Sequence, residues 1–250
     1  MALLHCELYS QALRMPTSVT IILPHDITRR TAPAPALYLL HGRSHNHSVW
    51  QRYTAIEQYC QPFHGAIIMP EVNRSFYTDM AYGVDYFTYL TEELPALCES
   101  MFHIGTDCSH RYIAGMSMGG YGSLKAALSK PDFYRGCAAI SAVTDICKHV
   151  EETAEADPKK REFRGIFGPE LVVPEKENLY KLAQKAHIRG KMPDLYFSCG
   201  TEDHLYQEGA DFRSWLSGHG ISFTYEEWSG IHDWGFWDTA IRKVLEYFWG

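Results

Sequence analysis

Positive charge is scarce in this sequence of 250 residues. It has 23 Lys and Arg residues against 30 Asp and Glu residues, which gives a formal net charge of −7. Proteins that bind the phosphate backbone of nucleic acids need a concentrated basic face, so the sequence predicts no nucleic-acid partner. The densest basic run, residues 159–161, stands beside several acidic residues. We interpret this run as part of a solvated helix with mixed charge, and not as a binding patch.

Long apolar runs and targeting signals are also missing. No stretch approaches the roughly 18 uninterrupted apolar residues that a membrane-spanning helix needs. The first residues lack the basic and apolar regions of a secretory signal peptide. We therefore expect a cytoplasmic protein with no membrane partner.

The cysteines do not form a recognisable framework. They are seven in number, widely spaced and without a C-x-x-C pair. In a chain with no secretory signal, we expect them to remain reduced thiols, several of them buried as small apolar side chains. The glycine patterns of nucleotide-binding loops are absent as well, and we expect no cofactor.

Apolar and amphipathic segments alternate along most of the chain. Residues 3–13 and 18–23 have the composition of an antiparallel strand pair. Apolar runs typical of buried parallel strands occupy residues 36–40, 65–69, 111–114, 137–142, 195–199 and 222–227. Helical patterns occupy residues 85–102, with a kink expected at Pro95, and residues 117–129, 207–217 and 238–248. This order predicts one α/β domain over residues 1–250, with a mostly parallel sheet covered by helices on both faces.

Residues 144–190 break this alternation. We expect them to form an insertion or cap over the carboxyl ends of the strands, where α/β proteins bind ligands.

Residues 115–119 match the pattern G-x-S-x-G, with Ser117 at its centre. Because the pattern arises by chance in about one chain of this length in ten, its context matters. An apolar strand precedes it directly and a helical segment follows, as in the nucleophile elbow of α/β-hydrolases. There the serine stands on a sharp, strained turn, and the glycines avoid collisions with neighbouring backbone. We therefore predict the α/β-hydrolase fold, with Ser117 as a catalytic nucleophile.

A serine hydroxyl needs a base to take its proton, and the base needs an acid to orient it. In this fold the acid follows a later strand and the histidine follows the last strand. Asp203 follows residues 195–199, and His232 follows residues 222–227. We predict Asp203 as the orienting acid and His232 as the general base.

Neighbouring residues offer alternatives for both roles. Glu202 adjoins Asp203, although the geometry of a loop after a strand favours Asp203. His204 also adjoins Asp203, but it precedes the last strand and is therefore disfavoured as the base. Asp233 follows His232 directly and fits the N-cap of the final helix better than the role of orienting acid.

The strand at residues 36–40 continues into His41-Gly42-Arg43. This resembles the loop that carries part of the oxyanion hole in α/β-hydrolases. Backbone N–H groups in such a site point at the oxygen on which negative charge develops. We predict the N–H groups of Arg43 and Met118 as the two donors.

Histidines at positions 41, 45 and 47 suggest a second hypothesis, a metal site. Their spacing lacks the carboxylate partners of familiar hydrolytic metal sites, so we favour a loop that borders the substrate pocket, with no metal. Aromatic residues in the stretch 76–83 are expected to line the same pocket, although many aromatics serve as core fillers. The candidate substrate-binding residues are His45, Tyr77, Tyr82 and Trp234.

Four motifs together resemble one known family. They are His41-Gly42 with Trp50, and the segments 115–122, 200–203 and 230–234. They are similar to those of the tributyrin-esterase branch of the esterase D-like α/β-hydrolases. Cinnamoyl and feruloyl esterases, S-formylglutathione hydrolases and mycolyltransferases are more distant relatives. The resemblance covers roughly residues 3–248.

The resemblance implies the roles already assigned to Ser117, Asp203 and His232, and the oxyanion donors at Arg43 and Met118. It also implies short acyl chains, an intracellular location, no cofactor and frequent homo-oligomers. One departure is Arg43 itself, because the branch often has a small or apolar residue after the glycine. The bulky basic side chain bears on the size of the pocket.

We therefore predict a serine carboxylesterase that acts on small-molecule esters through an acyl-enzyme, with acetylated or feruloylated carbohydrates among the candidate substrates. An acyltransferase is the first alternative, because the same triad can pass the acyl group to an alcohol when the pocket excludes water. A non-catalytic binding protein is the second, because a fold does not by itself determine a function.

Overall fold

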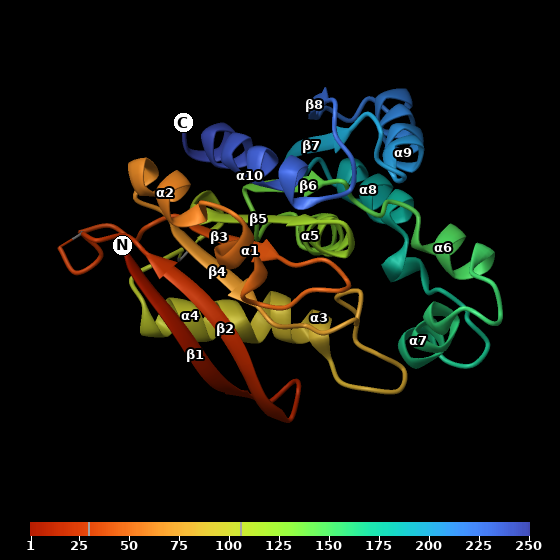
Figure 1. Ribbon diagram of the computed structural model, residues 1–250, viewed down its shortest axis with the longest axis horizontal. Coiled ribbons are helices and arrows are strands. Elements are labelled where there is room, and N and C mark those ends of the chain that lie inside the picture. The colour runs from red at the N-terminus through yellow and green to blue at the C-terminus, as the bar shows by residue number, and fades with distance from the viewer. Residues whose placement is uncertain (30, 106) are drawn as a thin grey trace.

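The computed structural model describes residues 1–29, 31–105 and 107–250. Within these residues, an eight-stranded sheet has the strand order β1-β2-β4-β3-β5-β6-β7-β8 (Figure 1). The strands are β1 (Ala2–Ser10), β2 (Met15–Leu23), β3 (Ala36–Leu40), β4 (Ala66–Pro70), β5 (Arg111–Met116), β6 (Gly136–Ile140), β7 (Asp194–Gly200) and β8 (Thr224–Trp228). β1 and β2 form an antiparallel hairpin, and β2 pairs antiparallel with β4. All the other pairings are parallel.

The parallel strands β3 to β6 are buried along almost their whole length. Continuous apolar runs form such strands because helices cover both faces of the sheet. The strands lie where the sequence predicts them, with ends that differ by one or a few residues.

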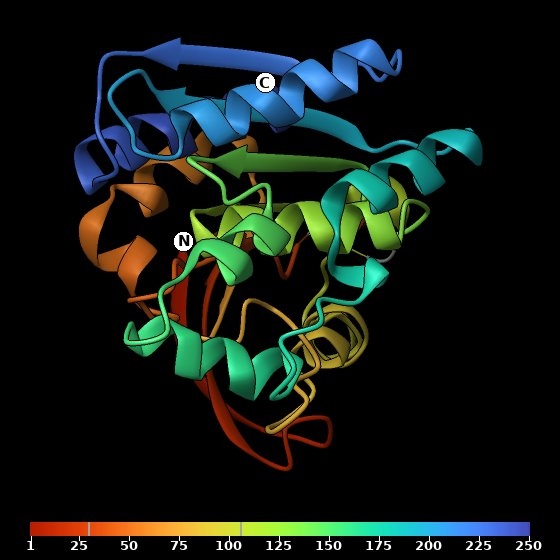
Figure 2. The same ribbon diagram turned by 90° about the vertical axis from the view of Figure 1, so that its right-hand side faces the viewer.

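Helices cover both faces of the sheet (Figure 2). One face packs against α1 (Val49–Tyr53), α2 (Ile56–Cys60) and α10 (Trp234–Trp249). The other packs against α3 (Tyr86–Thr88), α4 (Leu94–Met101), α5 (Met118–Ser129), α8 (Leu179–Ile188) and α9 (Tyr206–Gly218). In the part of the chain that the structure describes, no helix has both the length and the apolar character needed to cross a lipid bilayer.

The helix predicted over residues 85–102 contains a π-helical stretch, Tyr89–Glu93, between α3 and α4. Pro95 lies in the first turn of α4, where its missing N–H group is tolerated. Helical conformation continues through Pro95, from Tyr86 to Met101.

The last helix, α10, begins four residues earlier than predicted. Asp233 is its N-cap, and its carboxylate accepts a hydrogen bond from the N–H of Phe236 at 3.2 Å. This confirms the capping role expected of Asp233.

The expected insertion at residues 144–190 contains α6 (Ile146–Glu152), α7 (Pro158–Phe167) and α8. The helix α8 packs on α5, as a crossover helix between β6 and β7 does. The departure from regular alternation is therefore confined to residues 144–178, which we call the cap. Helices α6 and α7 of the cap stand at one side of the sheet (Figure 1).

The order of the strands explains where the site forms. From β3 the chain passes to β4 on one side, and then to β5 on the other side of β3. Such a reversal opens a crevice at the carboxyl ends of the two strands. The oxyanion loop follows β3 and the nucleophile elbow follows β5, so both meet at this crevice.

Candidate active site

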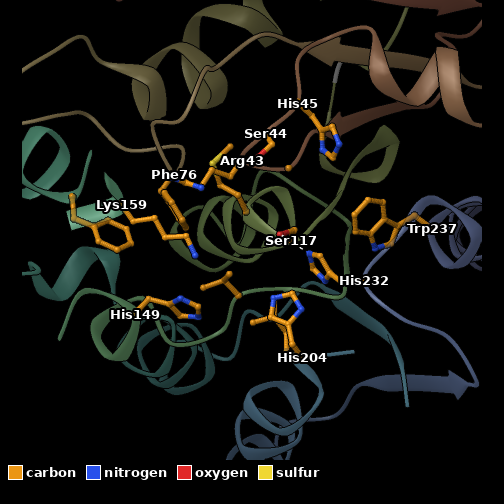
Figure 3. A pocket seen from close by; sticks show the side chains of 15 residues that line it. Arg43, Ser44, His45, Phe76, Ser117, His149, Lys159, His204, His232 and Trp237 are labelled. Carbon is orange, nitrogen blue, oxygen red and sulfur yellow. Dashed lines mark hydrogen bonds between the residues drawn. The ribbon is translucent and has the colours of Figure 1, made fainter. Parts of the chain in front are cut away.

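The loops after β3, β5, β7 and β8 surround a cavity of about 210 Å³ together with the cap (Figure 3). Ser117 lies in its wall, between β5 and α5. Its backbone has φ 58° and ψ −119°, a conformation that residues with a side chain rarely adopt. The N–H of Ser117 donates to Ile140 O at 2.9 Å, which helps to hold this turn. The strained turn predicted from the motif is therefore present.

The two glycines of the motif allow the elbow to pack closely. A Cβ atom on Gly115 would lie 2.5 Å from the backbone of Gly119. A Cβ atom on Gly119 would lie 2.5 Å from Leu40 O on the neighbouring strand. Both distances are too short for any side chain, so the spacing of the motif follows from the packing of strand and helix.

His232 is hydrogen-bonded to both Ser117 and Asp203. Its Nε2 lies 3.1 Å from Ser117 Oγ, and its Nδ1 lies 2.8 Å from Asp203 Oδ2. An ionised carboxylate only accepts hydrogen bonds, so Nδ1 carries the hydrogen and Nε2 accepts the hydroxyl proton of Ser117. This arrangement can remove the proton from a serine hydroxyl as it attacks a carbonyl carbon.

The carboxylate of Asp203 is fully buried. Burial alone would raise its pKa, but hydrogen bonds from His232 and from the N–H of Leu205 (2.8 Å) outweigh it, and the pKa is lowered. Asp203 therefore stays ionised and can stabilise the imidazolium form of His232.

The residues beside Asp203 occupy other positions. Glu202 is exposed, and its carboxylate accepts the N–H of Gly230 at 2.6 Å, in the loop that carries the histidine. His204 has a largely exposed ring whose centroid lies 4.5 Å from that of His232. The structure thus brings Asp203 and His232 to Ser117, with Glu202 and His204 beside them.

Arg43 and Met118 both line the cavity next to Ser117. Met118 is the first residue of α5, where N–H groups have no acceptor within the helix. Behind the loop, Trp50 Nε1 donates to Leu40 O at 3.1 Å, and the Tyr77 hydroxyl donates to His41 O at 2.8 Å. These contacts hold the backbone from which the N–H of Arg43 projects.

The three clustered histidines have separate surroundings. His41 Nδ1 bonds to Gly42 O at 2.8 Å, and its Nε2 accepts the N–H of Val72 at 3.2 Å. His47 Nδ1 bonds to Thr20 Oγ1 at 2.8 Å. Among the described residues, these histidines do not gather three ligand atoms at one point.

His45 is the predicted substrate-binding residue that lines the cavity. Burial, with smaller contributions from His41 and His232, lowers its pKa, which favours the neutral ring. The ring packs edge-on against Trp234 and Trp237, with centroids 5.2 and 6.0 Å away.

The other three predicted substrate contacts, Tyr77, Tyr82 and Trp234, do not line the cavity. Tyr77 is fully buried behind the oxyanion loop, where its hydroxyl supports the backbone. Tyr82 is 68% exposed, and its N–H donates to Gly165 O at the end of α7. Trp234 forms a second layer behind His45 and stacks on Tyr53. Aromatic composition alone does not distinguish a pocket wall from its support.

The cap contributes residues that the sequence interpretation missed. His149 of α6 and Lys159 and Phe163 of α7 line the cavity. The basic run 159–161 was interpreted as a solvated face and not as a binding patch; Lys159 is indeed exposed, but it also lines the cavity. Lys160 instead donates to Val150 O at 2.8 Å, and Arg161 is exposed. The spacing of Lys159 and Phe163, four residues apart on one helix face, was the available signal.

Arg43 also connects the oxyanion loop to the cap. Its guanidinium lies 2.7 Å from Glu162 Oε2 on α7, and Arg74 lies 2.9 Å from the other oxygen of Glu162. The side chain that departs from the family pattern therefore spans two walls of the cavity.

Comparisons with known proteins identify the family of the chain. Residues 10–248 match the model of the family described as "Putative esterase". The chain is 29% identical over 260 residues to an acetyl esterase of Caldicellulosiruptor saccharolyticus, in an alignment that covers 99% of this chain and 98% of the relative.

Two solved structures from Staphylococcus aureus are similar over the whole chain. One is FphF, a fluorophosphonate-binding serine hydrolase in a substrate-bound form, with a TM-score of 0.90 and 30% identity over 100% of this chain and 98% of that one. The other is the apoenzyme of the S-formylglutathione hydrolase FrmB, with a TM-score of 0.88 and 32% identity over 100% and 99%. These likenesses confirm the α/β-hydrolase fold and the esterase D-like branch that the motifs indicated. The chain belongs to this esterase family and is a serine carboxylesterase.

Proposed function

We propose that this protein hydrolyses short-chain acyl esters through an acyl-enzyme on Ser117, with His232 as the general base and Asp203 as the orienting acid. The observation that carries the proposal is the hydrogen-bonded series from Ser117 Oγ through His232 to Asp203, with distances of 3.1 and 2.8 Å. Ser117, the first member of this series, has a strained backbone and lines the cavity.

The reaction has two halves. In the first, Ser117 Oγ attacks the ester carbonyl while His232 Nε2 takes its proton, and the N–H groups of Arg43 and Met118 stabilise the oxyanion. The intermediate then collapses, and the alcohol leaves with the proton from His232. In the second half, water attacks the acyl group, His232 takes its proton, and Ser117 regains a proton as the acid leaves.

The size of the cavity supports small acyl groups. Its volume is about 210 Å³, and a cavity of about 150 Å³ in another protein holds one benzene molecule. Phe76, Phe163 and Trp237 form the apolar part of the wall. On one side, Arg43 of the oxyanion loop forms an ion pair with Glu162 of the cap. The acetyl esterase relative is consistent with an acyl group of this size.

A series of p-nitrophenyl esters of increasing acyl length tests the proposal. We expect kcat/KM to be greatest for acetyl to butyryl esters and to fall for longer chains. Ser117→Ala and His232→Ala should each lower kcat by at least about three orders of magnitude, and Ser117→Ala should abolish labelling by a fluorophosphonate. An undiminished rate in either variant would remove that residue from the mechanism.

The same enzyme preparation separates hydrolase from acyltransferase. Product analysis with and without an added alcohol or sugar acceptor shows whether the acyl group passes to water or to the acceptor. Acetylated and feruloylated saccharides in the same assay separate these two candidate substrate classes.

We also propose a cytoplasmic location. All seven cysteines are free thiols, and thiols persist in reducing compartments. Fractionation of source cells tests this proposal, and recovery of the protein outside the cytoplasm would contradict it.

A further inference from the structure

The charges around the cavity are one-sided. Among the described residues that line it there are two side chains with a permanent positive charge, Arg43 and Lys159, and no Asp or Glu. The protein as a whole carries a net charge of −7. The cavity is therefore a locally basic site in an acidic protein.

Most basic groups in this wall have a carboxylate partner behind it. Arg43 pairs with Glu162, and His149 Nε2 lies 2.8 Å from Glu208 Oε2. His232 and His204 both lie beside Asp203, with nitrogen–oxygen distances of 2.8 and 3.5 Å. These carboxylates offset the positive charge of the groups that they contact.

Lys159 differs from these groups. The residue is exposed at the mouth of the cavity, and in the described part of the chain its ammonium group forms no ion pair and no hydrogen bond. Figure 3 shows its side chain extending from α7 into the cavity on the side of His149. Phe163, one turn further along α7, lines the same wall and is buried. The helix therefore presents a cation beside an apolar surface.

Lys159 is also separate from the catalytic series. The proton relay joins Ser117, His232 and Asp203 and does not include it. An unpaired cation in the wall of a substrate cavity attracts an anion and gives no advantage to a neutral ester. Because the charge acts at a distance from the ester bond, it affects binding more than the chemical step.

We propose that Lys159 binds a carboxylate carried by the substrate, so that the preferred substrates are esters with a second, anionic end. This inference rests on the proposed function and names a substrate class for it. The carboxylate can belong to the acyl group, as in the half-ester of a dicarboxylic acid, or to the alcohol, as in an acylated hydroxy acid. The recognition chemistry, an ammonium–carboxylate pair at the wall of the cavity, is the same in both cases.

Two matched pairs of substrates test the inference. Monoethyl glutarate against ethyl pentanoate places the charge on the acyl side. The para-acetoxybenzoate anion against its methyl ester places the charge on the alcohol side. In one of the two pairs the carboxylate is on the side of the ester that reaches Lys159. For that pair, we expect Lys159→Gln to lower kcat/KM for the anionic ester about 5- to 10-fold, mainly through a higher KM. The kcat/KM for the neutral ester should stay nearly unchanged.

Charge reversal and salt provide further measurements. Lys159→Glu should lower kcat/KM for the anionic ester more than Lys159→Gln does, because repulsion replaces attraction. In the intact enzyme, raising the ionic strength should reduce the preference for the anionic ester, since salt screens a partly exposed pair. The pair of substrates that responds identifies the side that carries the carboxylate.

Arg161→Gln and Arg161→Glu are the matched controls. Arg161 lies on the same helix, is exposed and does not line the cavity, so these variants change the net charge equally without changing the cavity wall. They should leave the ratio of kcat/KM for the anionic ester to kcat/KM for the neutral ester unchanged in both pairs of substrates. Thermal unfolding should show that all four variants are folded.

The inference would be overturned if the anionic-to-neutral ratio of kcat/KM were the same in the intact enzyme and in both Lys159 variants, for both pairs of substrates. An equal effect of the Arg161 variants would also overturn it, because the response would then come from net charge. Failure of the proposed function looks different, since the intact protein would not hydrolyse the neutral esters. That result would overturn both the proposed function and this inference.

Discussion

Ser117 combines an unfavourable backbone conformation with a hydroxyl group held for reaction. Its φ of 58° and ψ of −119° lie in a region that glycine adopts far more readily than serine. The packing of β5 and α5 around Gly115 and Gly119 imposes this conformation. The strain therefore lowers stability in exchange for an exposed nucleophile.

Ser117→Gly should accordingly raise stability while it abolishes esterase activity. We expect a gain of about 1 kcal/mol relative to Ser117→Ala, or roughly 2–4 °C in Tm for a chain of this size. Ser117→Ala is the matched control, because it removes the hydroxyl and keeps a Cβ atom. A lower Tm for the glycine variant than for the alanine variant would contradict this explanation.

Asp203 and Glu202 are adjacent carboxylates with different surroundings. Asp203→Asn should lower kcat by at least about 100-fold, because an amide can donate to His232 and stabilise the wrong tautomer of the ring. Glu202→Gln should change kcat by less than about 3-fold, because Glu202 is exposed and accepts hydrogen bonds from Ser229 and Gly230 and not from His232. Steady-state kinetics on one p-nitrophenyl ester measures both, and the reverse order would exchange the two roles.

At the scale of elements, one partly buried and one fully buried carboxylate fix the two ends of the cap. At its start, Glu208 of α9 accepts the N–H groups of Thr144 and Asp145 at 2.6 and 2.9 Å. At its end, Glu177 pairs with Lys125 of α5, and both side chains are almost completely buried. The cap is therefore held to the helices on one face of the sheet, and Lys159 is carried on a supported segment.

Glu208→Gln should lower stability at neutral pH and reduce the acid sensitivity of folding. Burial alone would raise the pKa of Glu208, but His149 and the two backbone N–H groups outweigh it, so the pKa is lowered in the folded protein. A lowered pKa contributes stability that is fully present above the unfolded value, about 4.3, and is lost as the pH falls through the folded value.

Thermal unfolding from pH 7 down to pH 3 measures this contribution. The Tm of the intact protein should fall more steeply than that of Glu208→Gln below about pH 5. At pH 7 the variant should unfold at a lower temperature, because hydrogen bonds to a charged group contribute about 1.5–3 kcal/mol each. Parallel curves for the two proteins would show that Glu208 has the same pKa in the folded and unfolded states.

At the scale of the whole molecule, the described residues contain no disulfide that supplements the core. All seven cysteines are free, and Cys60, Cys98, Cys137 and Cys199 are buried. Stability therefore comes from the two apolar layers on either side of the sheet.

A reducing agent should leave the Tm unchanged. The reason is that the folded protein has no disulfide to lose. Unfolding scans with and without dithiothreitol measure this, and titration of the unfolded protein with a thiol reagent should count seven thiols. A fall in Tm on reduction would show that some of these thiols pair in solution.

Much of the fold could be predicted because the local patterns agree with one another. The apolar runs, the helical spacings and the strained glycine-flanked turn all indicate the same sheet. The differences are local, as at α10, where Asp233 starts the helix earlier than its apolar pattern suggested. The cap was harder to delimit, since α8 belongs to the regular layer through its packing on α5 and not through any local signal.

The sequence by itself determined which residues meet: Ser117, Asp203 and His232 follow different strands, and the carboxyl ends of parallel strands lie at one edge of a sheet. Only the tertiary structure decided what faces them across the cavity. It placed Lys159 and Phe163 at the wall of the cavity and Arg161 away from it, and it placed Tyr77 behind the oxyanion loop. The physical reason is that strand order follows from local patterns along the chain, whereas the inward face of a cap helix depends on long-range packing.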